Sequence, residues 1–196
     1  MDALTVAAYD AAAGDYARDW LAQPAPDDMY ALLARHFKAG GVTADIGCGA
    51  GRDTAWLVAQ GYAASGYDPS AGLLERARAA YPGVRFDVAA LPGLGGIGDA
   101  TCDNVLCETV IMHLPPAEVP GAVAGLARIL KSGGTLYLSW RVSAGEGQRD
   151  KAGRLYAGFA ADVVRGALPR GEMLLDAQST SASSGKTIHR VMFRKA

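Results

Sequence analysis

Cysteine is scarce in this chain of 196 residues. The three cysteines, Cys48, Cys102 and Cys107, form no C-x-x-C pair and show no repeated spacing. Small disulfide-held domains use a dense and even-numbered set of cysteines, and zinc sites place their ligands at short, regular intervals. The three histidines have no acidic or cysteine partner at ligand spacing either. The sequence therefore indicates neither a disulfide framework nor a metal site.

An excess of one charge and long apolar runs are also missing. The chain carries 19 Lys and Arg residues against 20 Asp and Glu residues, a formal net charge of −1. Such a chain has no overall field that would attract nucleic acid or an anionic membrane. No apolar run approaches the roughly 18 residues of a membrane span, and no basic residue precedes an apolar stretch at the N-terminus. We therefore expect a cytoplasmic protein without nucleic-acid or membrane partners.

The apolar content is sufficient for one hydrophobic core. Hydrophobic residues make up 50% of the chain and charged residues 20%, a composition typical of globular proteins rather than disordered ones. The length is that of one domain. Neither a linker nor an internal repeat divides the sequence. We predict a single domain over residues 1–196.

The N-terminal segment 1–38 is expected to be helical. An alanine-rich stretch with three aromatic residues comes first, and two prolines separate it from a helix that begins at Asp27 or Asp28. The first twenty or so residues supply no strand, so we predict that they form a lid. The apolar positions of the second helix recur at helical spacing and should face the core: Met29, Leu32, Leu33 and Phe37.

From Gly41 onward, short apolar strands alternate with helical stretches, as in βαβ units with a parallel sheet. The last two strands have no room for a crossover helix between them and should form a hairpin. We therefore predict an α/β core over residues 41–196, parallel except for one strand. Strands are expected at 42–46, in a segment that ends at 68, at 84–88, around 105–107, and at 135–140, 173–177 and 188–194. Helices are expected at 52–60, around 73–77, at 119–130 with Gly133 and Gly134 as the stop, and around 155–164.

The strongest chemical signal is the segment Asp45–Gly51, D-I-G-C-G-A-G, between a strand and a helix. Glycine lets the backbone turn sharply and approach a ligand, and the helix N-terminus presents unpaired N–H groups. Asp68 ends the next strand, where an acid accepts hydrogen bonds from ribose hydroxyls in nucleotide-binding folds. Alternatively, the loop is a tight connection that binds nothing, and Asp68 starts the turn at Pro69. A dinucleotide fingerprint reads G-x-G-x-x-G, so the spacing G-x-G-x-G makes a nicotinamide or flavin cofactor the second choice.

Four motifs in order resemble those of the class I S-adenosylmethionine-dependent methyltransferase superfamily. They lie at 45–51, 66–70, 103–114 and 126–136. The resemblance implies a Rossmann-like three-layer αβα sandwich whose seven-stranded sheet ends in an antiparallel strand. It implies S-adenosylmethionine as the cofactor. The continuation G-R-D-T at 51–54 is similar to a bacterial small-molecule branch of the superfamily.

The resemblance also implies which residues hold the cofactor. Asp45, Gly47 and Gly49 would hold its methionine end. Many members carry an acid just before the Leu-Pro that follows the third strand, but this chain has Ala90 there, and Asp87 lies too early. We therefore expect backbone groups around Ala90 to recognise the adenine. The complete set of expected cofactor-binding residues is Asp45, Gly47, Cys48, Gly49, Gly51, Arg52, Asp68, Pro69, Ala90, Leu91, Cys107 and Glu108.

The candidate catalytic residues follow the fourth strand. Methyl transfer from a sulfonium is a one-step displacement, so the enzyme mainly holds the reacting groups in line. Glu108 and His113 lie at the carboxyl edge of the sheet, where ligands bind, and are candidate bases. A backbone-bonded structural histidine and a glutamate that contacts the cofactor are open alternatives. The acceptor pocket is expected at the same edge, bordered by Tyr9 or Tyr16, Glu108, His113 and Arg141.

The acceptor is expected to be a small molecule. The chain lacks an N-P-P-Y type motif after the fourth strand, and by family analogy this weighs against nucleic-acid amines and glutamine as acceptors. Only the N-terminal helices and the stretch 141–154 remain to enclose a pocket. We expect a monomer or homodimer. The alternatives are a non-catalytic S-adenosylmethionine-binding sensor or partner protein and a nicotinamide-dependent oxidoreductase.

Overall fold

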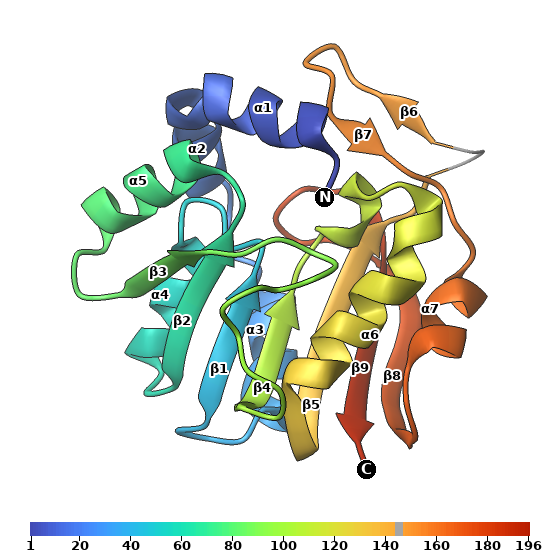
Figure 1. Cartoon of the computed structure of the whole chain (residues 1–196). Coiled ribbons are helices and arrows are strands. Elements are labelled where there is room, and N and C mark those ends of the chain that lie inside the picture. Colours follow the sequence, from blue (N-terminus) through green and yellow to red (C-terminus); the bar gives the residue numbers. More distant parts are fainter. Residues whose placement is uncertain (144–146) are drawn as a thin grey trace.

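The computed structural model describes residues 1–143 and 147–196. Seven strands form one sheet in the spatial order β3-β2-β1-β4-β5-β9-β8. Strands β1 to β5 pair in parallel, whereas β9 is antiparallel to both of its neighbours. The predicted seven-stranded, mostly parallel sheet with an antiparallel last strand is therefore confirmed (Figure 1). The strands are β1 (Val42–Ile46), β2 (Ala63–Asp68), β3 (Arg85–Val88), β4 (Cys102–Cys107), β5 (Leu130–Arg141), β8 (Gly171–Thr180) and β9 (Thr187–Lys195).

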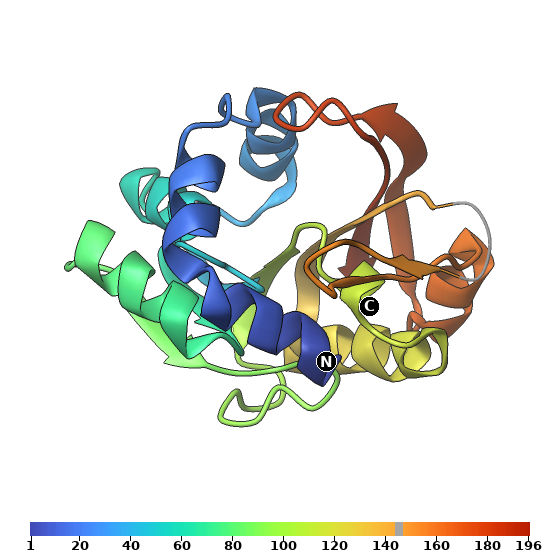
Figure 2. The same cartoon turned by 90° about the horizontal axis from the view of Figure 1, so that it is seen from above.

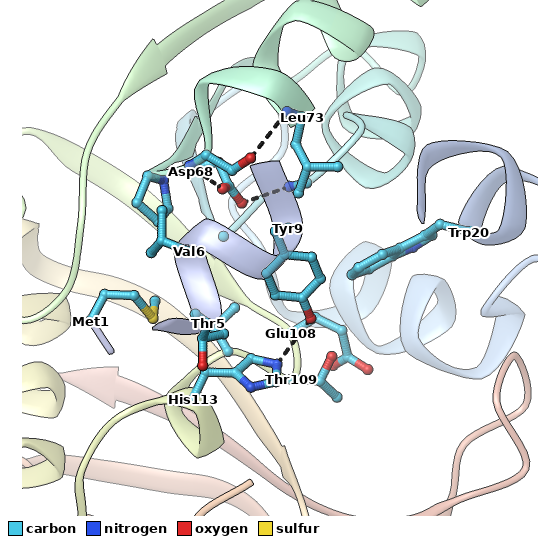
Figure 3. Close-up of a pocket in the computed structure, with 15 residues that line it drawn as sticks. Met1, Thr5, Val6, Tyr9, Trp20, Asp68, Leu73, Glu108, Thr109 and His113 are labelled. Atoms are coloured by element: carbon cyan, nitrogen blue, oxygen red, sulfur yellow. Dashed lines mark hydrogen bonds between the residues drawn. The ribbon is translucent and has the colours of Figure 1, made fainter. Parts of the chain in front are cut away.

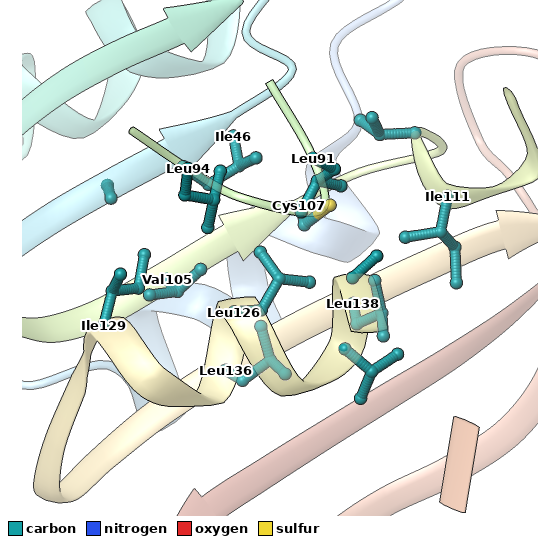
Figure 4. Close-up of a cluster of buried hydrophobic side chains, with 14 of the residues drawn as sticks. Ile46, Leu91, Leu94, Val105, Cys107, Ile111, Leu126, Ile129, Leu136 and Leu138 are labelled. Carbon is teal, nitrogen blue, oxygen red and sulfur yellow. The ribbon is translucent and has the colours of Figure 1, made fainter. Parts of the chain in front are cut away.

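Helices cover both faces of the sheet and complete the αβα sandwich. On one face, α3 and α4 pack against the side chains of Leu106 and Tyr137. On the other, α6 and α7 cover a cluster that includes Val105 and Leu138, part of which Figure 4 shows. Each large aliphatic side chain buried there contributes roughly 1.5–3 kcal/mol. The helices are α1 (Ala3–Ala11), α2 (Ala13–Leu21), α3 (Asp27–His36), α4 (Arg52–Ala59), α5 (Ala71–Ala80), η1 (Ile111–His113), η2 (Pro116–Glu118), α6 (Val119–Ile129) and α7 (Ala161–Ala167).

Helix α6 ends before the glycines that were expected to stop it. Its last residue is Ile129, and Leu130 has an extended backbone and pairs with Cys102 of β4. The register between β4 and β5 shifts just beyond this pair, and Gly133 has a φ of +74°. The prediction that Gly133 and Gly134 terminate the helix was therefore wrong, because strand pairing captures the chain at Leu130.

The expected helix around 155–164 is also shorter than predicted. Leu155 and Tyr156 form the short strand β7 (Leu155–Tyr156), which pairs with β6 (Gln148–Arg149) in a two-stranded sheet. The helix, α7, occupies only Ala161–Ala167. The apolar residues of this stretch follow helical spacing in the sequence, but the backbone pairing of β7 overrides that local pattern.

Three segments lie around the carboxyl edge of the parallel strands: α1, the β6–β7 hairpin and the loop 181–186 (Figure 2). Helix α1 is bound to the hairpin, because the N–H of Leu155 donates to Thr5 Oγ1 at 2.9 Å. The Arg149 guanidinium also pairs with the Asp2 carboxylate at 2.8 Å. None of the helices in the described ranges is long and apolar enough to cross a membrane.

Candidate active site

The glycine loop lies directly against neighbouring backbone and side chains. The N–H of Gly47 donates to the Tyr67 carbonyl at 2.7 Å, which joins the loop to the end of β2. Gly47 has a φ of +77°, and a Cβ on it would lie 2.3 Å from Val110 Cγ2. Both the backbone angle and this close approach require glycine at the position. The Gly49 φ is +53°, and its missing Cβ faces the ring of Trp20 at 3.6 Å.

Asp68 is buried at the end of β2 and lines a cavity beside this loop. Its two carboxylate oxygens accept hydrogen bonds from the N–H groups of Gly49 at 3.0 Å and Ser70 at 2.9 Å. Burial raises the pKa of Asp68 to about 6, against the lowering effect of these bonds. A carboxylate has about four acceptor positions, so it can still accept bonds from a ligand.

Arg52, at the start of α4, belongs to a second polar group. Its guanidinium pairs with Asp53 at 2.9 Å, and Asp53 also accepts a bond from the Tyr30 hydroxyl at 2.7 Å. The Arg52 side chain lies over the ring of Trp20, 5.9 Å from the ring centroid. Within the described part of the chain, Arg52 Nη1 is buried and has no hydrogen-bond partner. This unpaired donor is suited to an anionic group of a ligand.

Other residues of the expected cofactor set lie beneath the loop. Asp45 accepts a bond from Thr54 Oγ1 at 2.6 Å, and burial raises its pKa to about 8. Cys48 packs against Leu74 and Phe86. A Cβ on Gly51, which begins α4 with a φ of +84°, would lie 2.6 Å from the Phe86 ring. These residues shape and support the loop from below and do not border its cavity: Asp45, Cys48 and Gly51.

Three further residues of the expected cofactor set, near the predicted adenine site and at the end of β4, do not border the cavity beside the loop either. Ala90 and Leu91 are absent from the lining of the cavity beside the loop, and the Ala90 carbonyl accepts from the N–H of Leu94 at 2.8 Å. Cys107 is buried in the hydrophobic core. Asp87, which lies too early in the sequence for the adenine contact, pairs with exposed Arg85 at 2.6 Å and borders neither of the cavities described below.

Two cavities meet at the carboxyl edge of the sheet. The first, with about 460 Å³ of empty space that includes open solvent, lies between the glycine loop, the start of α5 and helix α1 (Figure 3). The second, with about 980 Å³ measured in the same way, lies between α1, α2, the β6–β7 hairpin and the loop 181–186. The expected acceptor-pocket residues Tyr16 and Arg141 border the second cavity. The lining of both cavities contains Tyr9, Trp20, Glu108, Thr109 and His113.

His113 is a neutral, fully bonded imidazole at this junction. Its Nδ1 lies 2.6 Å from the Leu155 carbonyl. Its Nε2 lies 3.2 Å from the Tyr9 hydroxyl (Figure 3). A carbonyl can only accept, so Nδ1 donates and Nε2 accepts from Tyr9. Burial lowers the pKa of His113 to about 4. In this arrangement the histidine orients Tyr9 and has no free lone pair for a substrate.

Glu108 is the carboxylate at the junction of the two cavities. It follows the last residue of β4 and accepts a hydrogen bond from Ser139 Oγ on the adjacent strand β5. Burial raises the pKa of Glu108, although this bond acts in the opposite direction. A carboxylate with a raised pKa that borders both cavities is placed to accept a proton.

The second cavity contains residues that the sequence analysis did not single out. Arg154 pairs with Asp150 at 2.6 Å, and its guanidinium lies 4.7 Å from the ring centroid of Tyr16 and 5.6 Å from that of Tyr156. The stretch 141–154 was expected to border the acceptor, but no motif marked Arg154 within it. The part of that stretch at 144–146 lies outside the described residues. No group of His, Cys, Asp and Glu side chains that could hold a metal ion occurs among the residues described.

Comparison with known families decides the class of the protein. Residues 44–138, which include the glycine loop, Asp68 and Glu108, match a family model described as a methyltransferase domain. This match identifies residues 44–138 as a methyltransferase domain. The predicted superfamily, enzyme class and cofactor are thereby confirmed. A comparison with curated proteins found no match.

Solved structures share the fold of this methyltransferase. A 1,6-didemethyltoxoflavin-N1-methyltransferase from Burkholderia thailandensis is 24% identical, with a TM-score of 0.79 over 99% of this chain and 88% of that one. A TehB-like methyltransferase from Corynebacterium glutamicum is 19% identical, with a TM-score of 0.70 over 95% and 99%. A protein from Rhodobacter sphaeroides described as a putative zinc-dependent alcohol dehydrogenase is 13% identical, with a TM-score of 0.77 over 100% and 99%. At these identities the likeness shows the fold alone, and the family match favours the methyltransferase over the nicotinamide-dependent alternative.

Proposed function

We propose that this methyltransferase transfers a methyl group to a small-molecule acceptor bound in the second cavity, by direct displacement. The observation that carries the proposal is the junction of the two cavities at Tyr9, Glu108 and His113. A cofactor in the first cavity and an acceptor in the second would meet there without an intermediate carrier. The roles of individual residues below are part of this proposal.

The residues of the first cavity fit S-adenosylmethionine. Asp68 has acceptor positions left for two ribose hydroxyls, and Gly49 leaves open the space beside Trp20 that a side chain would fill. Arg52, which borders the adjoining second cavity beside Trp20, would bind the carboxylate of the methionine end through its unpaired Nη1. Asp45 would act from below, by holding Thr54 and with it the first turn of α4.

The chain's own residues would orient the reactants and accept a proton. When bound, the cofactor supplies a methyl group on positively charged sulfur, which leaves with the bonding electron pair as a neutral thioether. Tyr9, held by His113 Nε2, would form the wall against which the acceptor lies. Glu108 would accept the proton that a hydroxyl or ammonium acceptor loses. Such orientation supplies about 7–11 kcal/mol in well-aligned systems.

A small acceptor is supported by the walls of the second cavity and by a fold neighbour. Tyr16 on α2, Tyr156 on the β6–β7 hairpin and Ser183 in the loop 181–186 line the cavity from three different segments, which favours a compact ligand over a polymer. The Burkholderia neighbour, described as an N1-methyltransferase of 1,6-didemethyltoxoflavin, acts on a small molecule. The formal net charge of −1 also gives the chain no overall positive field of the kind that favours binding along phosphates.

The proposal is tested by transfer of label from radioactive S-adenosylmethionine. The purified protein is incubated with a panel of small hydroxylated, amine-containing and thiol-containing acceptors, and in parallel with tRNA, DNA and protein substrates. We expect labelled product in the small-molecule reactions. Rates on a macromolecule far above those on any small acceptor would contradict the small-molecule assignment, and failure to bind the cofactor would contradict the cavity assignment.

The pKa of Asp68 predicts a pH dependence of cofactor affinity. The charged carboxylate accepts the ribose hydrogen bonds, so affinity for S-adenosylhomocysteine should be constant above pH about 6 and decrease below it. Proton linkage sets the slope at about tenfold per pH unit for one group. Isothermal calorimetry measures the profile, with Asp68→Asn as the reference that should lack this transition. An identical pH profile in both proteins would show that another group controls affinity.

We further propose that α1 and α2 form the lid over the cofactor, while α3, although part of the segment 1–38, packs on the sheet. Asp10 on α1 accepts bonds from Ser70 Oγ at 2.6 Å and the Gly72 N–H at 3.0 Å. Asp10→Ala should therefore speed S-adenosylhomocysteine release about fivefold, from a loss of about 1 kcal/mol. Stopped-flow dissociation measures this rate. Asp15→Ala, an exposed change on α2, is the control, and equal rates in both variants would contradict the lid.

A further inference from the structure

Basic side chains outnumber acidic ones in the second cavity. In the described residues its lining contains four basic and two acidic side chains: Arg52, Arg141, Arg154, Lys186, Asp19 and Glu108. Arg52 lies over Trp20, next to the glycine loop, and serves the cofactor in the proposal above. The other three basic groups come from β5, the β6–β7 hairpin and the loop 181–186.

Two of these three basic groups share one aromatic ring. The guanidinium of Arg141 lies 5.5 Å from the ring centroid of Tyr156, and that of Arg154 lies 5.6 Å from it. Arg154 is balanced by Asp150 at 2.6 Å and enclosed by tyrosine rings, so its main effect is to fix that wall. Arg141 and Lys186 are the cations left to meet a ligand.

The acidic side chains do not cancel this charge. Asp19 is exposed and lies 3.7 Å from the Arg18 guanidinium, which offsets its charge. Glu108 lies at the junction with the first cavity, where it is bonded to Ser139. Within the described residues, neither of these carboxylates forms an ion pair with Arg141 or Lys186.

The walls of the same cavity are aromatic. The rings of Tyr9 and Tyr16 are in edge contact, with centroids 4.9 Å apart, and the centroid of the Tyr156 ring lies 5.6 Å from the Arg154 guanidinium. Aromatic side chains bind flat ring systems by stacking and edge contacts, beyond the area that they bury. A ligand that uses both features would be planar and negatively charged.

We propose that the acceptor is a planar aromatic carboxylate, whose ring lies along the tyrosine wall and whose carboxylate is bound by Arg141 and Lys186. This inference rests on the proposed function, because it takes the second cavity as the acceptor site. The nucleophilic atom of the acceptor is then at the opposite end of the ring, towards Glu108. The charge fixes the orientation in which that atom meets the methyl group.

The test uses pairs of probes that differ in charge alone. One-ring and two-ring aromatic carboxylates, such as the three hydroxybenzoates and the hydroxynaphthoates, are compared with their carboxamides on protein saturated with S-adenosylhomocysteine. Calorimetry or ligand-observed NMR measures binding. We expect at least one acid to bind at least about tenfold more tightly than its amide, and Arg141→Gln to weaken that acid about 10-fold to 100-fold, as for one charge-assisted hydrogen bond.

A matched variant separates a local effect from a change in net charge. Arg170→Gln removes the same charge from an exposed position outside both cavities and should leave acid binding unchanged. Equal binding of acids and amides, equal binding of acids to the wild type and Arg141→Gln, or binding of none of the acids would each overturn the inference.

Failure of this inference is distinguishable from failure of the proposed function. Arg141 does not border the first cavity, so Arg141→Gln should bind S-adenosylhomocysteine with the affinity of the wild type. Intact cofactor binding and methyl transfer without any preference for acids would contradict only the anionic acceptor. If the wild type does not bind S-adenosylhomocysteine at all, the proposed function itself is contradicted.

Discussion

Gly49→Val is expected to abolish binding of S-adenosylhomocysteine while the protein stays folded. A side chain at this position would enter the space between the loop and Trp20, where the missing Cβ lies 3.6 Å from the indole ring. Overpacking alone costs about 1–3 kcal/mol, and a ligand that needs the same volume is excluded altogether. Affinity measured by calorimetry should fall by more than about 100-fold.

The control for this variant carries the same backbone strain without filling the cavity. Gly61, after α4, has a φ of +86°, and a Cβ on it would meet nothing within 4 Å. Gly61→Val should lower the free energy of unfolding by about 1–3 kcal/mol but leave cofactor affinity unchanged. If folded Gly49→Val still binds the cofactor, or if both variants lose affinity equally, the loop does not hold the cofactor in the proposed way.

Glu108→Gln is expected to lower kcat by about 10²–10⁴ for an acceptor that loses a proton, the usual contribution of a general base. Glutamine keeps the shape of the side chain and its contact with Ser139 but cannot accept the proton. Single-turnover rates at saturating cofactor, measured with the acceptor found by label transfer, separate chemistry from binding.

The pH profile gives a second readout for Glu108. Wild-type rates should decrease on the acidic side as this carboxylate becomes protonated, since burial raises its pKa, and the acidic limb should be missing in Glu108→Gln. Glu172→Gln, at an exposed position on β8, is the control. A rate for Glu108→Gln within about threefold of the wild type would assign proton removal to solvent, because a positioned base contributes far more than that.

The sheet was predictable because strand and helix periodicities alternate clearly in residues 42–140. The strand Val42–Ile46 was predicted to the residue, and the hairpin followed from the short Ser-rich connection between its strands. The end of α6 was not predictable, because Leu130 continues the helical pattern and only its pairing with Cys102 in β4 makes it extended. Pairing of Leu155 with Arg149 explains the missed β7 in the same way.

The position of a candidate residue was predictable where it depends on the local backbone, and less so where it depends on tertiary contacts. The positions of the glycine loop and of Asp68 could be predicted because they lie at the carboxyl ends of β1 and β2. The sequence could not show that Asp45 is turned towards Thr54, or that His113 is bonded on both ring nitrogens. The position of Arg154 among three tyrosine rings joins segments more than a hundred residues apart, so no sequence motif reports it.

The attachment of α1 to both sides of the carboxyl edge has a consequence for the order of events in a catalytic cycle. Asp10 ties the helix to α5 beside the cofactor cavity, and Thr5 and Tyr9 tie it to the hairpin and to His113 beside the acceptor cavity. In the proposed arrangement, the cofactor would exchange only when the helix also detaches from the wall of the second cavity. Such a linkage predicts a compulsory sequence in which the cofactor enters first, the methylated acceptor departs next, and the spent cofactor leaves last.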